Sequence, residues 1–295
     1  MRLYKTTIQP QSNFATTLRG DTLFGQMCWS IKYAFGEERL KELLLSYEKA
    51  PFLVVSDGFS SGYLPKPKMP SAFLNENSND KKVNRKKIWL TLEQLKSGNF
   101  LDAKTDEEVK NSDNSIVTMH NSINYKSFTT SDDGSFAPYG EKEFSIGNKD
   151  IYFLLDDAQF SLDDLSKTFE QLSLGGYGKD TTVGKGRFIF ENFEEVKTTN
   201  KSKTFMTLSP FSAKDIKCKE MYYEPFVRFG KFGGDRAFKN AFKKPILMAD
   251  TASVIDFEEI QELQYIGNAI KNISDAHPDA VHQGYSIVVP IKELS

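Results

Sequence analysis

A glycine-rich segment at residues 175–188 places the strongest restriction on how this chain can fold. It reads Gly-Gly-Tyr-Gly-Lys-Asp-Thr-Thr-Val-Gly-Lys-Gly-Arg-Phe and separates an amphipathic stretch from an aromatic-rich one. Because glycine has no Cβ, its amides can approach an anion closely and adopt the positive φ of a tight loop. The segment is basic in a chain whose formal net charge is −2. The pattern predicts an anion-binding loop, and the alternative is a surface turn between a helix and a strand.

The spacing of these glycines does not match the two common phosphate-binding loops. A Walker A loop requires Gly-Lys-Ser/Thr, but Gly186 follows Lys185 in this chain. A dinucleotide-binding fingerprint requires a third glycine where Ile189 stands, and it requires a helix to follow. ATP and NAD are therefore not expected, and no cofactor is predicted. A longer polyanion, RNA, fits the elongated pattern of glycines and cations better.

Composition limits the form that such an RNA surface can take. A pI near 6.0 argues against binding through bulk charge, so a nucleic-acid surface must be a local patch. The two cysteines, Cys28 and Cys218, lie far apart without a Cys-x-x-Cys motif, so neither a metal site nor a disulfide scaffold is indicated. The sequence has no run of about 18 apolar residues and no signal-peptide core. We therefore expect a cytoplasmic protein without membrane contact.

The first part of the chain alternates strand and helix patterns. The order is β-α-β-β-α-β, which is that of a ferredoxin-like unit. Asp21 is expected to cap the first helix and Ser161 the second. Residues 56–149 interrupt the order and predict a long insertion with little core of its own. The expected elements are strands at 1–9, 51–55, 150–155 and 187–193 and helices at 21–35 and from 161.

A polar stretch at 197–203 predicts a boundary between two domains, 1–197 and 198–295. The second domain is expected to be β-rich and a degenerate copy of the first, with a helix around 258–273. The fold class is thus α+β, with tandem ferredoxin-like (RRM-like) domains, a glycine-rich loop and an insertion, in which the family resemblance described below implies a β-hairpin thumb. The expected strands of the second domain are 204–208, 221–229, 245–248, 253–257 and 285–291.

Several motifs together resemble the RAMP superfamily of CRISPR proteins. Within it, the chain is similar to the Cas5-like subunit of type III-A effector complexes, which caps the 5′ end of the guide RNA. The insertion from 75 to 113 carries no such motif, and Arg19-Gly20 stands where many relatives have a histidine. Besides the glycine-rich loop, the motifs are Arg-Gly-Asp-Thr-Leu-Phe-Gly at 19–25, Gly-Tyr-Leu-Pro-Lys-Pro at 62–67, Tyr-Glu-Pro-Phe at 223–226, Gly-Gly at 233–234 and His-Gln-Gly-Tyr-Ser at 282–286.

The resemblance implies binding rather than turnover. Such a subunit holds the repeat-derived 5′ tag of the guide RNA, docks on the large polymerase-like subunit and contacts the backbone RAMP subunits. Target RNA is then met only indirectly. The resemblance also implies that a β-thumb in the insertion kinks the guide, and we expect residues 66–90 to project as this thumb. A basic run at 81–87 is either a solvated face or an RNA or partner surface.

Candidate RNA-binding residues fall in several separate places. The glycine-rich loop offers amides and cations that can follow successive phosphates. The start of the first helix offers free amides beside Arg19, although Asp21 and Thr22 can be plain capping residues. Phe232 could stack on a base, unless its segment is an ordinary hairpin tip. The set is Arg19, Asp21, Thr22, Lys66, Lys68, His120, Asn121, Gly176, Gly178, Lys179, Thr181, Thr182, Gly184, Lys185, Gly186, Arg187, Arg228, Lys231, Phe232, Gly233 and Gly234.

His120 provides the one alternative that involves catalysis. Some relatives cleave repeat RNA without a metal, using His, Tyr or Lys to move protons. The alternative function is therefore a metal-independent endoribonuclease that processes the guide precursor, with His120 as acid or base. A single histidine without an identified partner favours an RNA-contacting or structural residue instead. Adjacent acids such as Asp156-Asp157 are usual on solvated surfaces, so no metal site is predicted.

Overall fold

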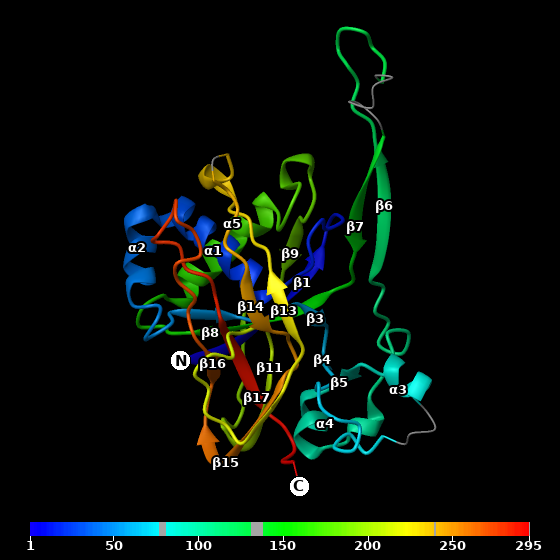
Figure 1. The fold of residues 1–295 in the computed structure, drawn as a ribbon, viewed down its shortest axis with the longest axis vertical. Coiled ribbons are helices and arrows are strands. Elements are labelled where there is room, and N and C mark those ends of the chain that lie inside the picture. The colour runs from blue at the N-terminus through cyan, green and yellow to red at the C-terminus, as the bar shows by residue number, and fades with distance from the viewer. Residues whose placement is uncertain (77–80, 131–137, 239, 295) are drawn as a thin grey trace.

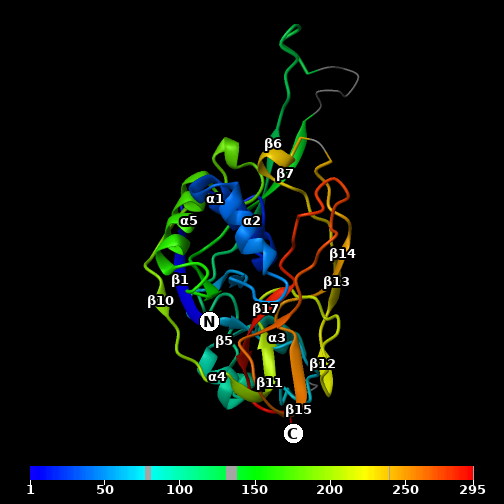
Figure 2. The same cartoon turned by 90° about the vertical axis from the view of Figure 1, so that its left-hand side faces the viewer.

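The computed structural model describes residues 1–76, 81–130, 138–238 and 240–294. The architecture is mixed α+β: two antiparallel sheets form the body, and a long hairpin extends away from it (Figure 1). The main helices gather at one end of the body, next to the first sheet (Figure 2). No helix within the described ranges has the length and apolar character needed to cross a lipid bilayer.

The first sheet contains the β-α-β-β-α-β order that the sequence predicted. Its strands follow the order β10-β1-β8-β2, with β9 also paired to β1 and β3 to β8, and neighbouring strands are antiparallel. Every residue of β8 is buried. The apolar run 151–155 leads one to expect this for its second part, whereas Lys149 and Asp150 are buried charged residues. The strands are β1 (Arg2–Pro10), β2 (Leu53–Val55), β3 (Phe59–Ser60), β8 (Lys149–Leu155), β9 (Phe188–Phe190) and β10 (Glu194–Glu195).

Two long helices accompany this sheet. α1 (Gly20–Phe35) buries Leu23, Phe24, Met27 and Ile31 on one face, and Gly36 at φ 92° ends it. α5 (Leu162–Gly175) starts at Ser161, whose hydroxyl accepts a hydrogen bond from the Asp164 amide, as predicted. A further helix, α2 (Glu37–Leu45), follows α1 directly.

The insertion divides into a packed lobe and a projecting hairpin. In the small lobe, residues 61–104, five large apolar side chains of the described residues are buried in the main core, which corrects the expectation that the insertion has little core. They are Leu64, Leu74, Leu90, Leu95 and Phe100. The lobe contains β4 (Leu64–Pro65), α3 (Lys81–Lys86), β5 (Trp89–Leu90) and α4 (Leu92–Ser97).

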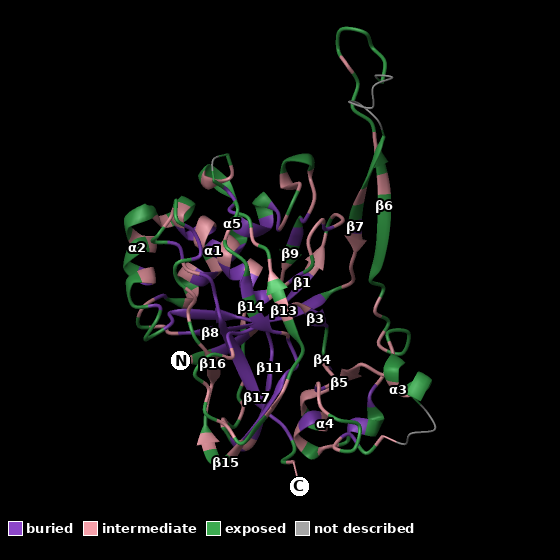
Figure 3. Ribbon diagram, in the orientation of Figure 1, coloured by how far each residue is buried: buried purple, intermediate pink, exposed green. Residues whose placement is uncertain are grey.

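The projecting hairpin is built from β6 (Asn114–His120) and β7 (Tyr139–Ser145), and we call residues 114–145 the thumb. Most of its side chains are exposed, whereas the sheets behind it are buried (Figure 3). The prediction that residues 66–90 project was therefore wrong, because that segment carries apolar residues that pack into the core. Residues 131–137 of this segment lie outside the described ranges.

The second sheet has the order β12-β15-β11-β17-β16, and all its neighbours are antiparallel. The helix expected at 258–273 is absent, since β15 runs on to Glu262 and β16 follows. The Glu-rich sequence favours a helix locally, but pairing of Lys201 with Glu262 across β11 and β15 outweighs that preference. The elements are β11 (Lys201–Thr207), β12 (Glu220–Tyr222), β15 (Val254–Glu262), β16 (Tyr265–Gly267) and β17 (Tyr285–Pro290), with β13 (Pro225–Arg228) and β14 (Ile246–Ala249) as a separate hairpin.

One hydrophobic cluster runs through both halves of the chain. It contains Leu154 of the first sheet together with Met206 and Ile287 of the second. The buried side chain of Gln283 adds a polar link, because its amide donates to the Val55 carbonyl at 2.8 Å and accepts from the Val55 amide at 2.9 Å. This link acts as one extra partner for the edge strand β2 and fixes the second half against it.

Candidate nucleic-acid interface

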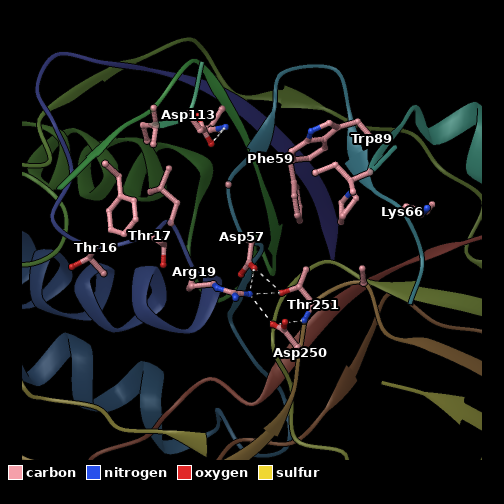
Figure 4. A pocket seen from close by; sticks show the side chains of 18 of the residues that line it. Thr16, Thr17, Arg19, Asp57, Phe59, Lys66, Trp89, Asp113, Asp250 and Thr251 are labelled. Atoms are coloured by element: carbon pink, nitrogen blue, oxygen red, sulfur yellow. Dashed lines mark hydrogen bonds and ion pairs between the residues drawn. The ribbon is translucent and has the colours of Figure 1, made fainter. Parts of the chain in front are cut away.

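A groove of about 670 Å³ lies where several parts of the chain meet (Figure 4). Its walls come from the loop before α1, the small lobe, the base of the thumb and the turn between β14 and β15. Phe59, Trp89 and Phe144 supply apolar surface, and a few charged groups converge on it. An apolar groove with a small number of polar groups is the usual form of a ligand site.

Arg19 lies in this groove and joins the two halves of the chain. Its Nη1 donates to Asp57 Oδ2 at 3.0 Å and to Asp250 Oδ1 at 2.8 Å. Burial raises the pKa of the Asp57 carboxyl to about 6, although the charge of Arg19 lowers it. Thr251 also donates to Asp57 Oδ2, at 2.6 Å. Because two carboxylates, one from each half of the chain, already surround the guanidinium, we interpret Arg19 first as a structural residue that links the two halves by ion pairs.

The lysines of the groove are paired with acids in the same way. Lys66 and Lys68 were predicted RNA contacts, whereas Lys149 carried no motif and was missed. Each pair balances the cation, so a phosphate could bind here only by displacing a carboxylate. The pairs are Lys66–Glu76 at 2.7 Å, Lys68–Asp250 at 2.7 Å and Lys149–Asp113 at 2.6 Å.

The backbone of the glycine-rich loop is folded against the protein. The Tyr177 amide donates to the Gly186 carbonyl at 2.8 Å, and the Gly186 amide donates to the Asn13 carbonyl at 2.8 Å. At Gly186, φ is +71° and an added Cβ would lie 2.0 Å from the Tyr177 carbonyl oxygen. The loop backbone is therefore mostly that of a surface turn, the alternative that the sequence left open. Fewer of its amides are free to bind an anion than the anion-binding prediction requires. Among the other predicted loop residues, Thr182 is exposed, Thr181, Gly178 and Gly184 are intermediate, and Gly176 is buried.

The cations of the loop differ in their surroundings. Lys179 is exposed and its Nζ lies 2.8 Å from Glu141 Oε1. Lys185 is less exposed and its Nζ lies 2.7 Å from Glu143 Oε2. Both carboxylates belong to β7 of the thumb. Arg187 is exposed, and within the described residues its side chain has no ion pair. It is thus the loop cation most open to an incoming phosphate.

Tyr177 connects the loop to the start of α1, a contact that no sequence motif indicated. The ring is fully buried, and its hydroxyl donates to the Thr17 carbonyl at 2.8 Å. The same oxygen accepts from the Arg19 amide at 3.2 Å. Burial raises the pKa of Tyr177, so the phenol stays neutral. Two predicted RNA-binding segments are therefore neighbours in space.

Asp21 is not a helix cap, which corrects the prediction for this residue. Its carboxylate is buried and accepts two hydrogen bonds from Arg228, at 2.6 and 3.0 Å. His282 Nε2 lies 3.2 Å from Asp21 Oδ2. Burial alone would raise the pKa of Asp21, but His282 and Arg228 together lower it to about 2. Asp21 and Arg228 were both predicted RNA contacts, but they form an ion pair that links the two halves of the chain. The predicted residue Thr22, which follows Asp21, is half-buried.

The cluster around residue 232 also differs from its prediction. Phe232 is only 8% exposed and meets the His277 ring edge-on at 5.0 Å, so its face is not open to a base. The exposed aromatic rings of this region are Phe229, Phe238 and Phe242, which the sequence pattern did not distinguish from Phe232. The predicted residues Lys231, Gly233 and Gly234 are exposed.

His120 lies on the thumb, facing the glycine-rich loop. Its ring stacks on Tyr139 at 5.7 Å, and its Nε2 lies 3.9 Å from Glu141 Oε2. Since Glu141 also pairs with Lys179, these four side chains form one cluster. The exposed Asn121 follows directly. In the described parts of the chain, no group of three or more His, Cys, Asp or Glu residues is arranged to hold a metal ion.

Two solved structures are similar to this chain in fold. A chain of the Csm1–Csm4 cassette in complex with AMPPNP aligns over 100% of both chains, with a TM-score of 0.63 and 16% identity. A chain of the Csm3–Csm4 subcomplex of the type III-A CRISPR–Cas interference complex aligns over 99% of this chain and 100% of that one, with a TM-score of 0.56 and 16% identity. Csm4 is the component common to both. This chain has the Csm4 fold.

The structural match extends over the length of the chain. No protein-family model matches the sequence, and no curated protein matches it. The resemblance inferred from short motifs is therefore confirmed by structure and not by overall sequence similarity. Cassettes in complex with cA4 and with one ATP show the same Csm4 fold, with TM-scores of 0.61.

Proposed function

We propose that this chain is a non-catalytic RNA-binding subunit of a type III-A CRISPR interference complex. In this role it captures the 5′ tag of the guide RNA, docks the large polymerase-like subunit and contacts a backbone RAMP subunit. The observation that carries the proposal is the Csm4 fold over the full chain, in structures named for Csm1–Csm4 and Csm3–Csm4 assemblies.

The proposed RNA path follows the groove, the rim of the glycine-rich loop and the thumb. Arg187 and Lys179 meet phosphates at the rim, because both are exposed there. Apolar side chains of the thumb then separate neighbouring bases, since an exposed ring or aliphatic group can insert between unstacked bases. Those exposed on the described part of the thumb include Val117, Met119, Ile123, Tyr125 and Phe128.

We also propose that the two sheets are tandem ferredoxin-like units. When the short strands β3, β10 and β16 are left aside and the others are ranked along the chain, the first sheet has the strand order 4-1-3-2 (β9-β1-β8-β2). The second sheet repeats this order as β17-β11-β15-β12. In the second unit, an irregular segment, 208–219, occupies the position of the first helix, and a segment that contains β16 occupies that of the second. This repeated order supports the proposal, and it accounts for the β-rich second half.

The test is a gel-shift experiment with the purified chain and end-labelled repeat RNA in EDTA, resolved on native and denaturing gels. We expect intact RNA and a shifted native band. A chain that leaves the RNA both intact and unshifted, alone and after co-purification with the large subunit, would contradict the RNA-binding role. Co-purification itself tests the docking role.

A metal-independent endoribonuclease is the second candidate, and one observation favours it. His120, Tyr139, Glu141 and Lys179 form a cluster of proton-transfer groups beside the proposed RNA path. In that mechanism His120 would accept the proton of a 2′-hydroxyl or supply one to the leaving 5′-oxygen. Discrete products that disappear in His120→Ala would establish the nuclease and overturn the non-catalytic proposal.

A further inference from the structure

The thumb is joined to the body at a junction of three chain segments. Residues 11–14 lie between the glycine-rich loop and the base of the thumb. On one side, the Gln11 amide donates to the Arg187 carbonyl and the Gly186 amide donates to the Asn13 carbonyl, both at 2.8 Å. On the other side, Phe14 and Phe144 exchange two backbone hydrogen bonds, at 2.7 and 2.8 Å. We call this region the thumb junction.

Glu143 lies at the centre of the thumb junction. Its side chain is only 3% exposed, which is unusual for a carboxylate on a projecting hairpin. Lys185 donates to it from the glycine-rich loop at 2.7 Å, and Asn13 Nδ2 donates to it at 3.0 Å. One carboxylate therefore receives a hydrogen bond from each of the two segments that face the thumb.

The pair formed by Lys179 and Glu141 lies further out along the same strand and differs in exposure. Lys179 is 59% exposed and Glu141 27%, so water and salt screen this pair. A phosphate can replace Glu141 at Lys179 with little loss. Displacing Glu143 from Lys185 instead leaves a buried carboxylate without its cation, which is strongly unfavourable.

We propose that Lys185 is a positioning residue that anchors the thumb through Glu143, and that Lys179 and Arg187, but not Lys185, contact RNA phosphates. The RNA part of this statement rests on the proposed function, whereas the anchor does not. The anchor holds the thumb in one direction before RNA binds. The thumb then loses less conformational entropy on binding.

Hydrogen exchange of the full chain without RNA tests the anchor. We expect Lys185→Met and Glu143→Gln each to accelerate exchange of the β6 and β7 amides, by about tenfold or more, because the hairpin then opens from its base. Lys179→Met, the matched control, should leave these amides unchanged. Lys185→Arg should restore protection, and the double variant should exchange no faster than the faster single variant. Unchanged exchange in both Lys185→Met and Glu143→Gln would overturn the anchor.

The salt dependence of RNA binding tests the second part. Each phosphate contact contributes about 0.7 to the slope of log affinity against log salt for a single strand. We expect Lys179→Met and Arg187→Met each to reduce the slope by about that amount, and Lys185→Met to leave it unchanged. A reduced slope in Lys185→Met would refute the division of roles while leaving the RNA-binding function intact. If the wild-type chain binds no RNA, either alone or after co-purification with the large subunit, the proposed function fails and the exchange experiment alone decides the anchor.

Discussion

Replacing the buried Asp21 by Asn tests the ion pair between Asp21 and Arg228 that links the two halves of the chain. Asp21 is fully enclosed, and it holds Arg228 and His282 on elements of the second half. Removing one partner of a buried ion pair leaves the other charge uncompensated and typically costs about 3–5 kcal/mol. Because Arg228 remains 23% exposed and can regain some hydration, we expect Asp21→Asn to lower the free energy of unfolding by about 3 kcal/mol.

The pKa of Asp21 gives a second figure, of similar size, for the stability that the charged carboxylate contributes. Its reduction from 3.8 to about 2 corresponds to roughly 2–3 kcal/mol of preferential stabilisation of the charged form. Because the folded pKa lies below the unfolded one, this stabilisation is complete above about pH 4 and is lost as the pH falls toward 2. The difference between wild type and Asp21→Asn should therefore be constant near neutral pH and shrink below pH 4.

Urea unfolding followed by circular dichroism provides the assay, with Glu48→Gln as the matched control. Glu48 pairs with Lys271 at the surface, where both side chains are about half exposed. Such a pair is worth about 0–1 kcal/mol, so the control should change little. If Asp21→Asn is no more destabilising than Glu48→Gln near pH 7, the reasoning on the buried pair is wrong.

Four further outcomes are expected. Gly186→Ala should lower the free energy of unfolding in urea by about 2 kcal/mol or more, because Gly186 has a positive φ and lies against the backbone of Tyr177. Gly184→Ala is the control, since Gly184 has open space around it, and should cost about 1 kcal/mol. Equal effects of the two substitutions would contradict the packing argument. Gln283→Ala should cost about 2–4 kcal/mol, since it leaves the buried Val55 amide and carbonyl unpaired, and a loss below 1 kcal/mol would refute the link. Replacing the thumb beyond its base, residues 116–142, by a short Gly-Ser turn should keep the melting temperature within a few degrees, because those side chains are mostly exposed. The same variant should bind RNA more weakly in the gel-shift assay, and unchanged binding would remove the thumb from the RNA path.

The first sheet could be predicted because its elements carry strong local signals. β8 contains a continuous apolar run at 151–155, α1 shows a helical apolar period ended by Gly36, and Ser161 marks the start of α5. In the second half, the strands expected at 204–208, 245–248, 253–257 and 285–291 overlap β11, β14, β15 and β17. The acidic end of β15 was predicted as a helix, because its sequence favours one locally and its pairing with Lys201 and Ser202 of β11 leaves no local signal. The thumb was misplaced because exposed hairpins have no apolar alternation that would reveal them.

The candidate site was predictable in its residue types but not in its partners. The sequence identified the cations of the glycine-rich loop, yet the acids that pair with them lie on the thumb, a distant part of the chain. Asp21 looked like a cap because it stands at a helix start, and its true partners come from the second half. Contacts between distant segments leave no local trace, so a single sequence cannot assign them.

The link between Gln283 and Val55 joins residues that are 228 positions apart. During synthesis, β2 and the carboxylate of Asp21 therefore leave the ribosome long before their partners exist. Until then the carboxylate of Asp21 has no partner and the edge of β2 is unpaired. An unpaired strand edge makes a partly folded chain prone to aggregate. Completion of β17 is then the step that closes the body, and truncation shortly before it should produce an insoluble chain rather than a stable first domain.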